Sequence, residues 1–301
     1  MKTLKLYCLI FLLVVPVHAI RAQKPIVINS ETFFLGEKQY DGIVVTIPEV
    51  GFEQVKNSWI KILEKGTKSK VVEAANGEIS IFGAFLKSIS KKPMNVYSQI
   101  ISQDSSTWLK TTVELKRDFY ITETNSESEY NQLKSILHEL AKTEYVDVVS
   151  NELSVEEKKQ QDLESELRNL QSEKERLGKS IQDDEQNILV SNEALLILDS
   201  DLKLKNEELA SHKTALNSAE NDIVRASIEE KIEQIEKEKN KIVNSIEKEN
   251  KNIVGYNSDI DDARIDIQTN IGQQNIKTGE VESQRSVVNK LTAKLATIEK
   301  Y

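Results

Sequence analysis

The fold is decided by residues 163–204, which read LESELRNLQSEKERLGKSIQDDEQNILVSNEALLILDSDLKL. Apolar residues recur here at intervals of seven residues, and the position that they share in each heptad is called position a. The a positions are apolar with one exception, and they are Leu167, Lys174, Ile181, Ile188, Leu195, Leu202, Leu209, Leu216 and Ile223. On a straight helix a strict seven-residue stripe drifts by about 20° per heptad, so only supercoiling around another helix keeps it buried. The stretch therefore predicts one arm of a coiled coil.

A second heptad register continues the pattern to the end of the chain. Its a positions are Ile232, Lys239, Ile246, Ile253, Ile260, Ile267, Gln274, Val281, Val288 and Leu295. Nine residues separate Ile223 from Ile232. In one unbroken helix this step of about two and a half turns would move the stripe to the opposite face. Asn221 can end a helix in the left-handed conformation, and Ser227 with Glu230 forms a capping box that can begin another.

We therefore predict an antiparallel coiled-coil hairpin over residues 152–300, with its tip near residues 221–227. Ser154 and Glu157 form another capping box, which we take as the start of the first arm. A parallel homodimer, in which each coil pairs with a second chain, remains the alternative. Polar residues in the seam are expected to weaken the coil and to fix its register, and they are Asp184, Lys205, His212, Lys239, Glu249, Asn270 and Lys277.

Residues 23–145 predict a different kind of domain, α+β in class. A β-rich run at residues 43–47 stops at Pro48, and helical spacing follows from Phe52 to Leu63. Two hairpins come next, one turning at Asn76-Gly77 and one at residues 103–107. A closing helix with apolar residues from Tyr130 to Leu140 is expected to begin at Ser126, where Ser126 and Glu129 match a capping box. We expect an antiparallel sheet with one face covered by two helices.

Composition separates the two regions and limits the partners. From Asn151 onward there are 32 acidic and 22 basic residues, whereas residues 1–150 have 17 acidic and 18 basic ones. Every Phe and Trp precedes residue 121. An acidic surface repels phosphates and anionic lipids, so we expect no nucleic-acid partner. A protein partner in the cell envelope and a homo-oligomer both remain open.

The N-terminus has the layout of a secretory signal peptide over residues 1–22. Lys2 and Lys5 precede an apolar run at residues 6–17, and the small residues Ala19 and Ala22 follow. The run is shorter than the about 20 residues that span a bilayer, so we expect cleavage and no membrane span afterwards; an uncleaved anchor is the alternative. Cys8, the only cysteine, lies in the run, and no Asn begins a glycosylation acceptor. A bacterial periplasmic or secreted location follows.

No cluster of residues indicates a named chemistry. Beyond residue 22 the chain has only His138 and His212, and no glycine-rich phosphate loop. Asp41 and Glu49 could pair for acid–base work, but we expect surface carboxylates. We predict no catalytic, cofactor-binding or metal-binding residues and no cofactors. The remaining aromatic candidates are Trp59, placed in the core, and Trp108 with Phe33-Phe34, for which we favour the core over an exposed recognition patch.

The segments Asn95-Val96-Tyr97 and Thr112-Val113-Glu114-Leu115, with the coil behind them, resemble an uncharacterised family of exported bacterial proteins. The resemblance implies a small N-terminal α+β domain and a long helical tail. We expect a non-enzymatic envelope scaffold whose coil spaces or oligomerises it and whose globular head binds a partner. The alternatives are a periplasmic holdase-type chaperone that uses its helical arms, and an envelope hydrolase acting through front-domain carboxylates.

Overall fold

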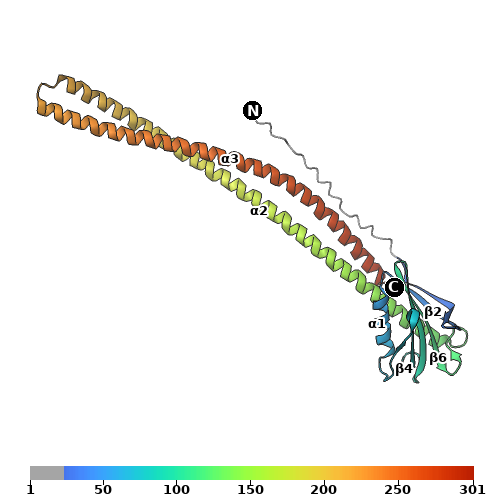
Figure 1. The fold of residues 1–301 in the computed structure, drawn as a ribbon. Helices are drawn as coiled ribbons and strands as arrows, with labels where there is room; N and C mark the ends of the chain where they lie inside the picture. The colour runs from blue at the N-terminus through green and yellow to red at the C-terminus, as the bar shows by residue number, and fades with distance from the viewer. Residues whose placement is uncertain (1–23) are drawn as a thin grey trace. The chain divides into compact units, whose positions relative to one another are not determined.

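The computed structural model describes residues 24–301 (Figure 1). These residues form two compact units. The sheet domain comprises residues up to Gln160 together with Ser283–Tyr301, and the coil unit comprises Gln161–Glu282. The signal peptide predicted at residues 1–22 lies outside the described residues. Among residues 24–301, no helix has an apolar stretch long enough to cross a bilayer.

The sheet domain is built on a seven-stranded antiparallel sheet, as expected. Its strands are β1 (Val27–Leu35), β2 (Lys38–Pro48), β3 (Val72–Glu73), β4 (Glu78–Ala84), β5 (Met94–Gln103), β6 (Ser106–Lys116) and β7 (Phe119–Tyr120). The order across the sheet is β1-β2-β6-β5-β4-β3, and β7 pairs with β6. All pairings are antiparallel, and short turns join the consecutive pairs β1–β2, β3–β4, β5–β6 and β6–β7.

Both hairpins predicted from the sequence are present. Between β3 and β4, Asn76 and Gly77 have φ of 60° and 73°, and the Glu78 N–H donates to the Ala75 carbonyl. Positive φ at both central residues defines the type I′ turn that this dipeptide favours. The β5–β6 turn is tighter than expected: only Asp104, at φ 51°, and Ser105 separate the two strands.

Two helices cover one face of the sheet, which confirms the two-layer prediction. They are α1 (Phe52–Leu63) and the first turns of α2 (Glu127–Ser218), which begins directly after Ser126 as the capping box indicated. Trp59 and Leu63 of α1, and Leu133, Leu137 and Tyr145 of α2, have almost no exposed surface. The end of α3 (Asp222–Ile298) adds Ile298 to the same core.

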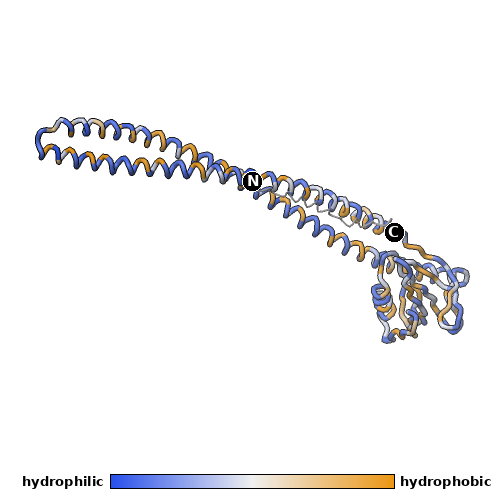
Figure 2. Tube along the Cα trace, turned by 45° about the horizontal axis from the view of Figure 1, so that its top comes forward, coloured by the Kyte–Doolittle hydropathy of each residue, from blue (hydrophilic) through white to orange (hydrophobic). Residues whose placement is uncertain are grey.

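The coil unit is an antiparallel pair formed by α2 and α3 within one chain, so the hairpin prediction is confirmed. Polar seam residues bond across the pair: Lys277 contacts Glu166 at 2.7 Å, and Lys205 contacts Glu238 at 2.8 Å. Ser191 donates to the Glu249 carboxylate at 2.9 Å. Hydrophilic and hydrophobic residues alternate along both helices (Figure 2). These polar contacts fix the register that apolar residues alone would allow to slip.

The helix ends differ from those expected. α2 runs without a break through Ser154, so the capping box there starts no helix. The turn lies at residues 219–221, and α3 begins at Asp222 instead of at Ser227. Asn221 caps the start of α3, because its side-chain oxygen accepts from the Ile223 N–H at 2.8 Å. Ile223, placed in the seam by its spacing, is 79% exposed.

Candidate binding surface of the sheet domain

The face of the sheet opposite the helices carries a group of aromatic side chains. Successive side chains of a strand point to opposite faces, and Val96 and Val113 point into the core. Tyr97 and Glu114, their neighbours, therefore point to the other face. We call the rings gathered there the tyrosine cluster, and they are Tyr40, Phe82, Tyr97 and Tyr120.

The rings of the tyrosine cluster pack on one another in favourable geometries. Tyr40 stacks on Tyr97, with ring centroids 5.9 Å apart, and meets Tyr120 edge to face at 5.2 Å. Phe82 meets Tyr97 edge to face at 6.0 Å. Such pairs contribute about 0.5–1.5 kcal/mol each beyond the area that they bury. The three tyrosines are half-buried and Phe82 is 56% exposed, so the cluster is ordered by its own contacts and still open to solvent.

The β1–β2 hairpin bends over this face. β2 pairs with β6 through residues 43–48, whereas its first half pairs only with β1. The Gly36 N–H in the hairpin turn donates to the Glu78 carboxylate of β4 at 3.0 Å. In a flat sheet β2 and β4 would lie three strand spacings apart, about 14 Å. The bend occurs at Gly42, where an added Cβ would lie 2.4 Å from the Thr111 carbonyl oxygen, and it buries Phe33.

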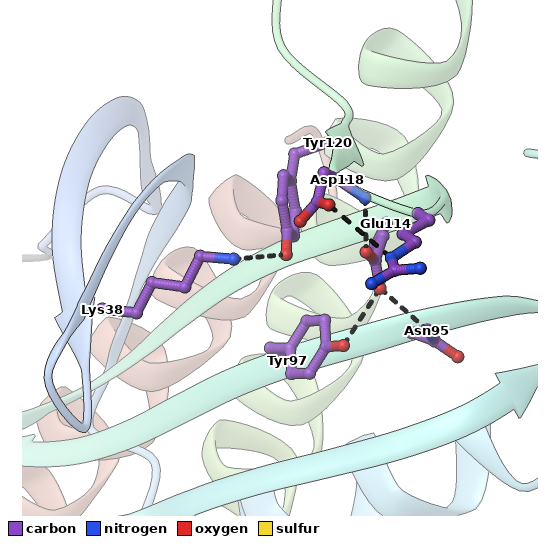
Figure 3. A network of polar contacts seen from close by, with 7 residues as sticks. Lys38, Asn95, Tyr97, Glu114, Asp118 and Tyr120 are labelled. Carbon is purple, nitrogen blue, oxygen red and sulfur yellow. Dashed lines mark hydrogen bonds and ion pairs between the residues drawn. The ribbon is translucent and has the colours of Figure 1, made fainter.

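A bonded carboxylate lies beside the rings (Figure 3). Glu114 accepts from Asn95 Nδ2 at 2.8 Å, from the Tyr97 hydroxyl at 3.0 Å and from the Asp118 N–H at 2.8 Å. The hydrogen bond from Asn95 is the main cause that holds the pKa of Glu114 below its ordinary value. With both oxygens engaged, this carboxylate is suited to orienting the surface and poorly suited to removing a proton from a substrate.

Lys38 lies on the other side of the rings. Its Nζ donates to the Tyr120 hydroxyl at 3.0 Å and lies 5.1 Å from the centre of the Tyr40 ring. The hydrogen bond with Tyr120 raises the pKa of Lys38, so it stays a cation. The surface thus combines accessible aromatic rings with one cation, one anion and the amide of Asn95. This combination suits recognition of another molecule by stacking and hydrogen bonding.

The tyrosine cluster should make the sheet domain sensitive to alkaline pH. Burial, followed by the hydrogen bond to Glu114, raises the pKa of Tyr97 from 10.0 to about 12. Because the folded-state pKa is the higher one, the stabilisation is complete below pH 10 and is lost as the pH rises towards 12. We expect Tyr97→Phe to flatten the decline of the urea midpoint over this range. A decline as steep as that of the unmodified protein would contradict this origin.

A second polar cluster ties the end of α3 to the sheet domain. Lys294 Nζ donates to Glu49 Oε2 at 2.5 Å, and the Tyr145 hydroxyl donates to Glu49 Oε1 at 3.3 Å. Burial raises the pKa of Tyr145. Glu49 has φ of 61°, a left-handed conformation that costs a non-glycine residue about 1–2 kcal/mol. The strained backbone places its carboxylate against both partners, so we assign this cluster to holding the helix end in place.

The structure separates the carboxylates singled out as a possible acid–base pair. Asp41 accepts from the Thr32 hydroxyl at 2.6 Å, whereas Glu49 bonds Lys294 and Tyr145. His138 lies 3.8 Å from the Glu139 carboxylate on the surface of α2. Within residues 24–301, no three His, Cys, Asp or Glu side chains lie close enough to hold a metal ion.

The aromatic candidates have mixed outcomes. Trp59 is buried in the core as predicted, and so is Phe33, under the bent hairpin. Phe34 is 61% exposed, and Trp108 is half-buried on the face of the tyrosine cluster, so the core prediction is wrong for Phe34 and incomplete for Trp108. The tyrosine cluster was not predicted from the sequence. In the sequence, the cluster is indicated only by Tyr97 and Glu114, which alternate along their strands with the core residues Val96 and Val113.

Comparisons with known proteins identify no family. No protein-family model and no curated protein matches the chain. Among solved structures, the chain is similar to a crystal structure of a coiled-coil segment of Smc from Pyrococcus yayanosii. That match has a TM-score of 0.47 and 23% identity, and it covers 58% of this chain and 75% of that one. The class of the protein therefore rests on its own fold, a small antiparallel sheet domain joined to a coiled-coil hairpin.

Proposed function

We propose that the protein is a non-enzymatic scaffold of the bacterial cell envelope, whose sheet domain binds a partner protein through the tyrosine cluster. The observation that carries the proposal is this cluster: ordered, solvent-accessible rings on the face opposite the helices, beside Lys38 and Glu114. Aromatic residues are enriched at protein interfaces, where their large surface costs little conformational entropy on binding.

Export to the periplasm or beyond is part of the proposal. It is supported by the charged, then apolar, then small-residue pattern of residues 1–22. The coil supports the role of a scaffold, because a paired helix extends by about 1.5 Å per residue and can separate a binding surface from other contacts. N-terminal sequencing of the protein purified from the periplasmic fraction tests this part. A first residue near Gln23 is expected, whereas an intact Met1 in the cytoplasm would contradict export.

The binding role can be tested with two phenylalanines of nearly equal exposure. Phe82 belongs to the tyrosine cluster and is 56% exposed, whereas Phe34, on the opposite face of the β1–β2 hairpin, is 61% exposed. We expect full-length protein with Phe82→Ala to lose a partner captured from envelope extract by about tenfold or more, since a central aromatic contact is worth 2 kcal/mol or more. Phe34→Ala should retain the partner. Equal losses, or none, would contradict the assignment.

A holdase is the second candidate, and one observation favours it. Large aliphatic side chains are more than half exposed on both helices of the coil unit, among them Leu196, Val254 and Ile265. Exposed apolar surface of this kind can bind unfolded clients. Suppression of aggregation of several unrelated client proteins at an equimolar ratio, unchanged by Phe82→Ala, would favour the holdase over the scaffold.

A further inference from the structure

One segment of α2 exposes a stripe of aliphatic side chains that nothing else within residues 24–301 covers. We call this group the outer stripe, and it consists of Leu189, Val190, Leu196, Ile197 and Leu204. Each is more than half exposed, although single exposed aliphatics are usually scattered on a soluble protein. They form two rows about 100° apart around the helix, one of Leu189 and Leu196 and one of Val190, Ile197 and Leu204, and the exposed Glu193 and Ser200 lie between the rows.

The outer stripe lies on the side of α2 that faces away from α3. Contacts to α3 come from Ser191 and Lys205, which bond Glu249 and Glu238. At about 100° per residue, Val190, Ile197 and Leu204 lie within about 20° of one line along the helix, and Ser191 lies about 120° away from Ile197. The segment is thus apolar on two faces. A helix that is apolar on more than one side is normally covered on each.

The spacing of the outer stripe indicates what covers it. Val190, Ile197 and Leu204 follow one another at seven-residue intervals, and so do Leu189 and Leu196. A seven-residue repeat stays in register only with a supercoiled helix, because a flat or irregular surface would lose contact as the stripe drifts. The occupant is therefore an α-helix with a matching apolar repeat.

The charge of this segment of α2 indicates which kind of helix can bind to the outer stripe. Between residues 183 and 208 there are eight acidic residues and two basic ones. The exposed Asp183 and Asp201 lie beside the row of Val190, Ile197 and Leu204, and the exposed Glu193 lies between the two rows. A second copy in parallel would place Glu193 against Glu193, and an antiparallel copy centred on Ile197 would place Glu193 against Asp201. Like charges at these positions disfavour both pairings, and they also disfavour an anionic lipid surface.

We propose that the outer stripe docks an amphipathic helix of a partner protein that carries a heptad apolar stripe flanked by Lys and Arg. Opposite charges at the flanking positions set partner choice and orientation in coiled coils, and here they select a basic helix. This interface is independent of the tyrosine cluster, so the protein would bind two partners through two surfaces and could hold them together.

A synthetic helix tests the proposal directly. The probe is a peptide of about 21 residues, three heptads long, with Leu at positions a and d and Lys at positions e and g; its matched partner has Glu in place of Lys. We expect full-length protein to bind the Lys peptide at least about tenfold more tightly than the Glu peptide, by fluorescence anisotropy. Glu193→Lys with Asp201→Lys should reverse this preference.

Matched variants locate the site. Ile197→Gln with Leu204→Gln alters two exposed residues of the outer stripe, and binding of the Lys peptide should fall about tenfold or more. Ile265→Gln with Ile276→Gln changes equally exposed residues of α3 and should leave binding unchanged. Equal binding of both peptides, or equal losses in both double variants, would overturn the proposal. So would a dimer of the unmodified protein in sedimentation that Ile197→Gln with Leu204→Gln dissociates, because the stripe would then bind a second copy.

Discussion

Replacing Trp59 with alanine is expected to lower the free energy of unfolding of the sheet domain by about 3–5 kcal/mol. The indole has no exposed surface, so its removal leaves a cavity between α1 and the sheet. It also removes a hydrogen bond, because Trp59 Nε1 donates to the Ser98 hydroxyl at 3.0 Å. Ser98 is itself buried and keeps only its contact with Thr111 at 3.1 Å.

The other tryptophan of the chain provides both the control and the reporter. Trp108 is half-buried on the opposite face of the sheet, so Trp108→Ala should cost clearly less than Trp59→Ala. Each variant keeps one tryptophan, whose fluorescence follows urea unfolding of the sheet domain without a signal from the coil, which has none. Equal losses in the two variants would show that α1 does not pack on the sheet as described.

The elements that were predicted correctly are determined by residues that lie close together in the sequence. The helix α1 follows from the spacing of Phe52, Val55 and Trp59, and the β3–β4 turn from one dipeptide, Asn76-Gly77. The hairpin of α2 and α3 follows from two heptad registers that are out of phase. In each case the determining residues lie within a few turns or strands of one another, so periodicity or turn chemistry is sufficient.

The helix ends show where local signals compete. The sequence predicts that Asn221 ends the first arm, because Asn tolerates the left-handed conformation, yet its side chain caps the second arm. Asn is common both at the end of a helix and as an N-cap. The tertiary structure, not the local sequence, determines which of the two positions Asn221 occupies. Ser154 with Glu157 gives the signature of a helix start but lies inside α2. Because α2 has already begun at Glu127, the motif at Ser154 marks no helix start.

The candidate site depended on contacts that no local pattern contains. Tyr40 meets Tyr97 only because the β1–β2 hairpin bends over the sheet at Gly42. Tyr120 joins them from the short strand β7. Sequence alternation could place Tyr97 and Glu114 on the non-core face, but not the hairpin above it. Long-range packing of this kind is set by the whole sheet, and it is the least predictable level of the fold.

Replacing Lys294 with methionine is expected to lower the free energy of unfolding by about 2–3 kcal/mol. Removing one partner of a buried ion pair typically costs about 3–5 kcal/mol, and the partial exposure of the partner reduces this value. The Lys294 side chain is 8% exposed and that of Glu49 is 19% exposed. Without the ammonium group the Glu49 carboxylate keeps only the Tyr145 hydroxyl. Lys290→Met, one turn earlier and exposed, is the control and should change stability by less than about 0.5 kcal/mol.

A double-mutant cycle separates this ion pair from the contact of the lysine ammonium group with the Tyr145 ring. Glu49→Gln alone leaves the Lys294 ammonium buried without its anion, and it should also destabilise the protein. With both substitutions the loss should be smaller than the sum of the single losses by about 1–2 kcal/mol, because neither charge is then left unpaired. Additive losses would mean that Lys294 stabilises the helix end through its ammonium group over the ring of Tyr145, whose centre lies 5.6 Å from the Lys294 Nζ. In that case the strained backbone of Glu49 would hold a carboxylate that the stability of the domain does not require.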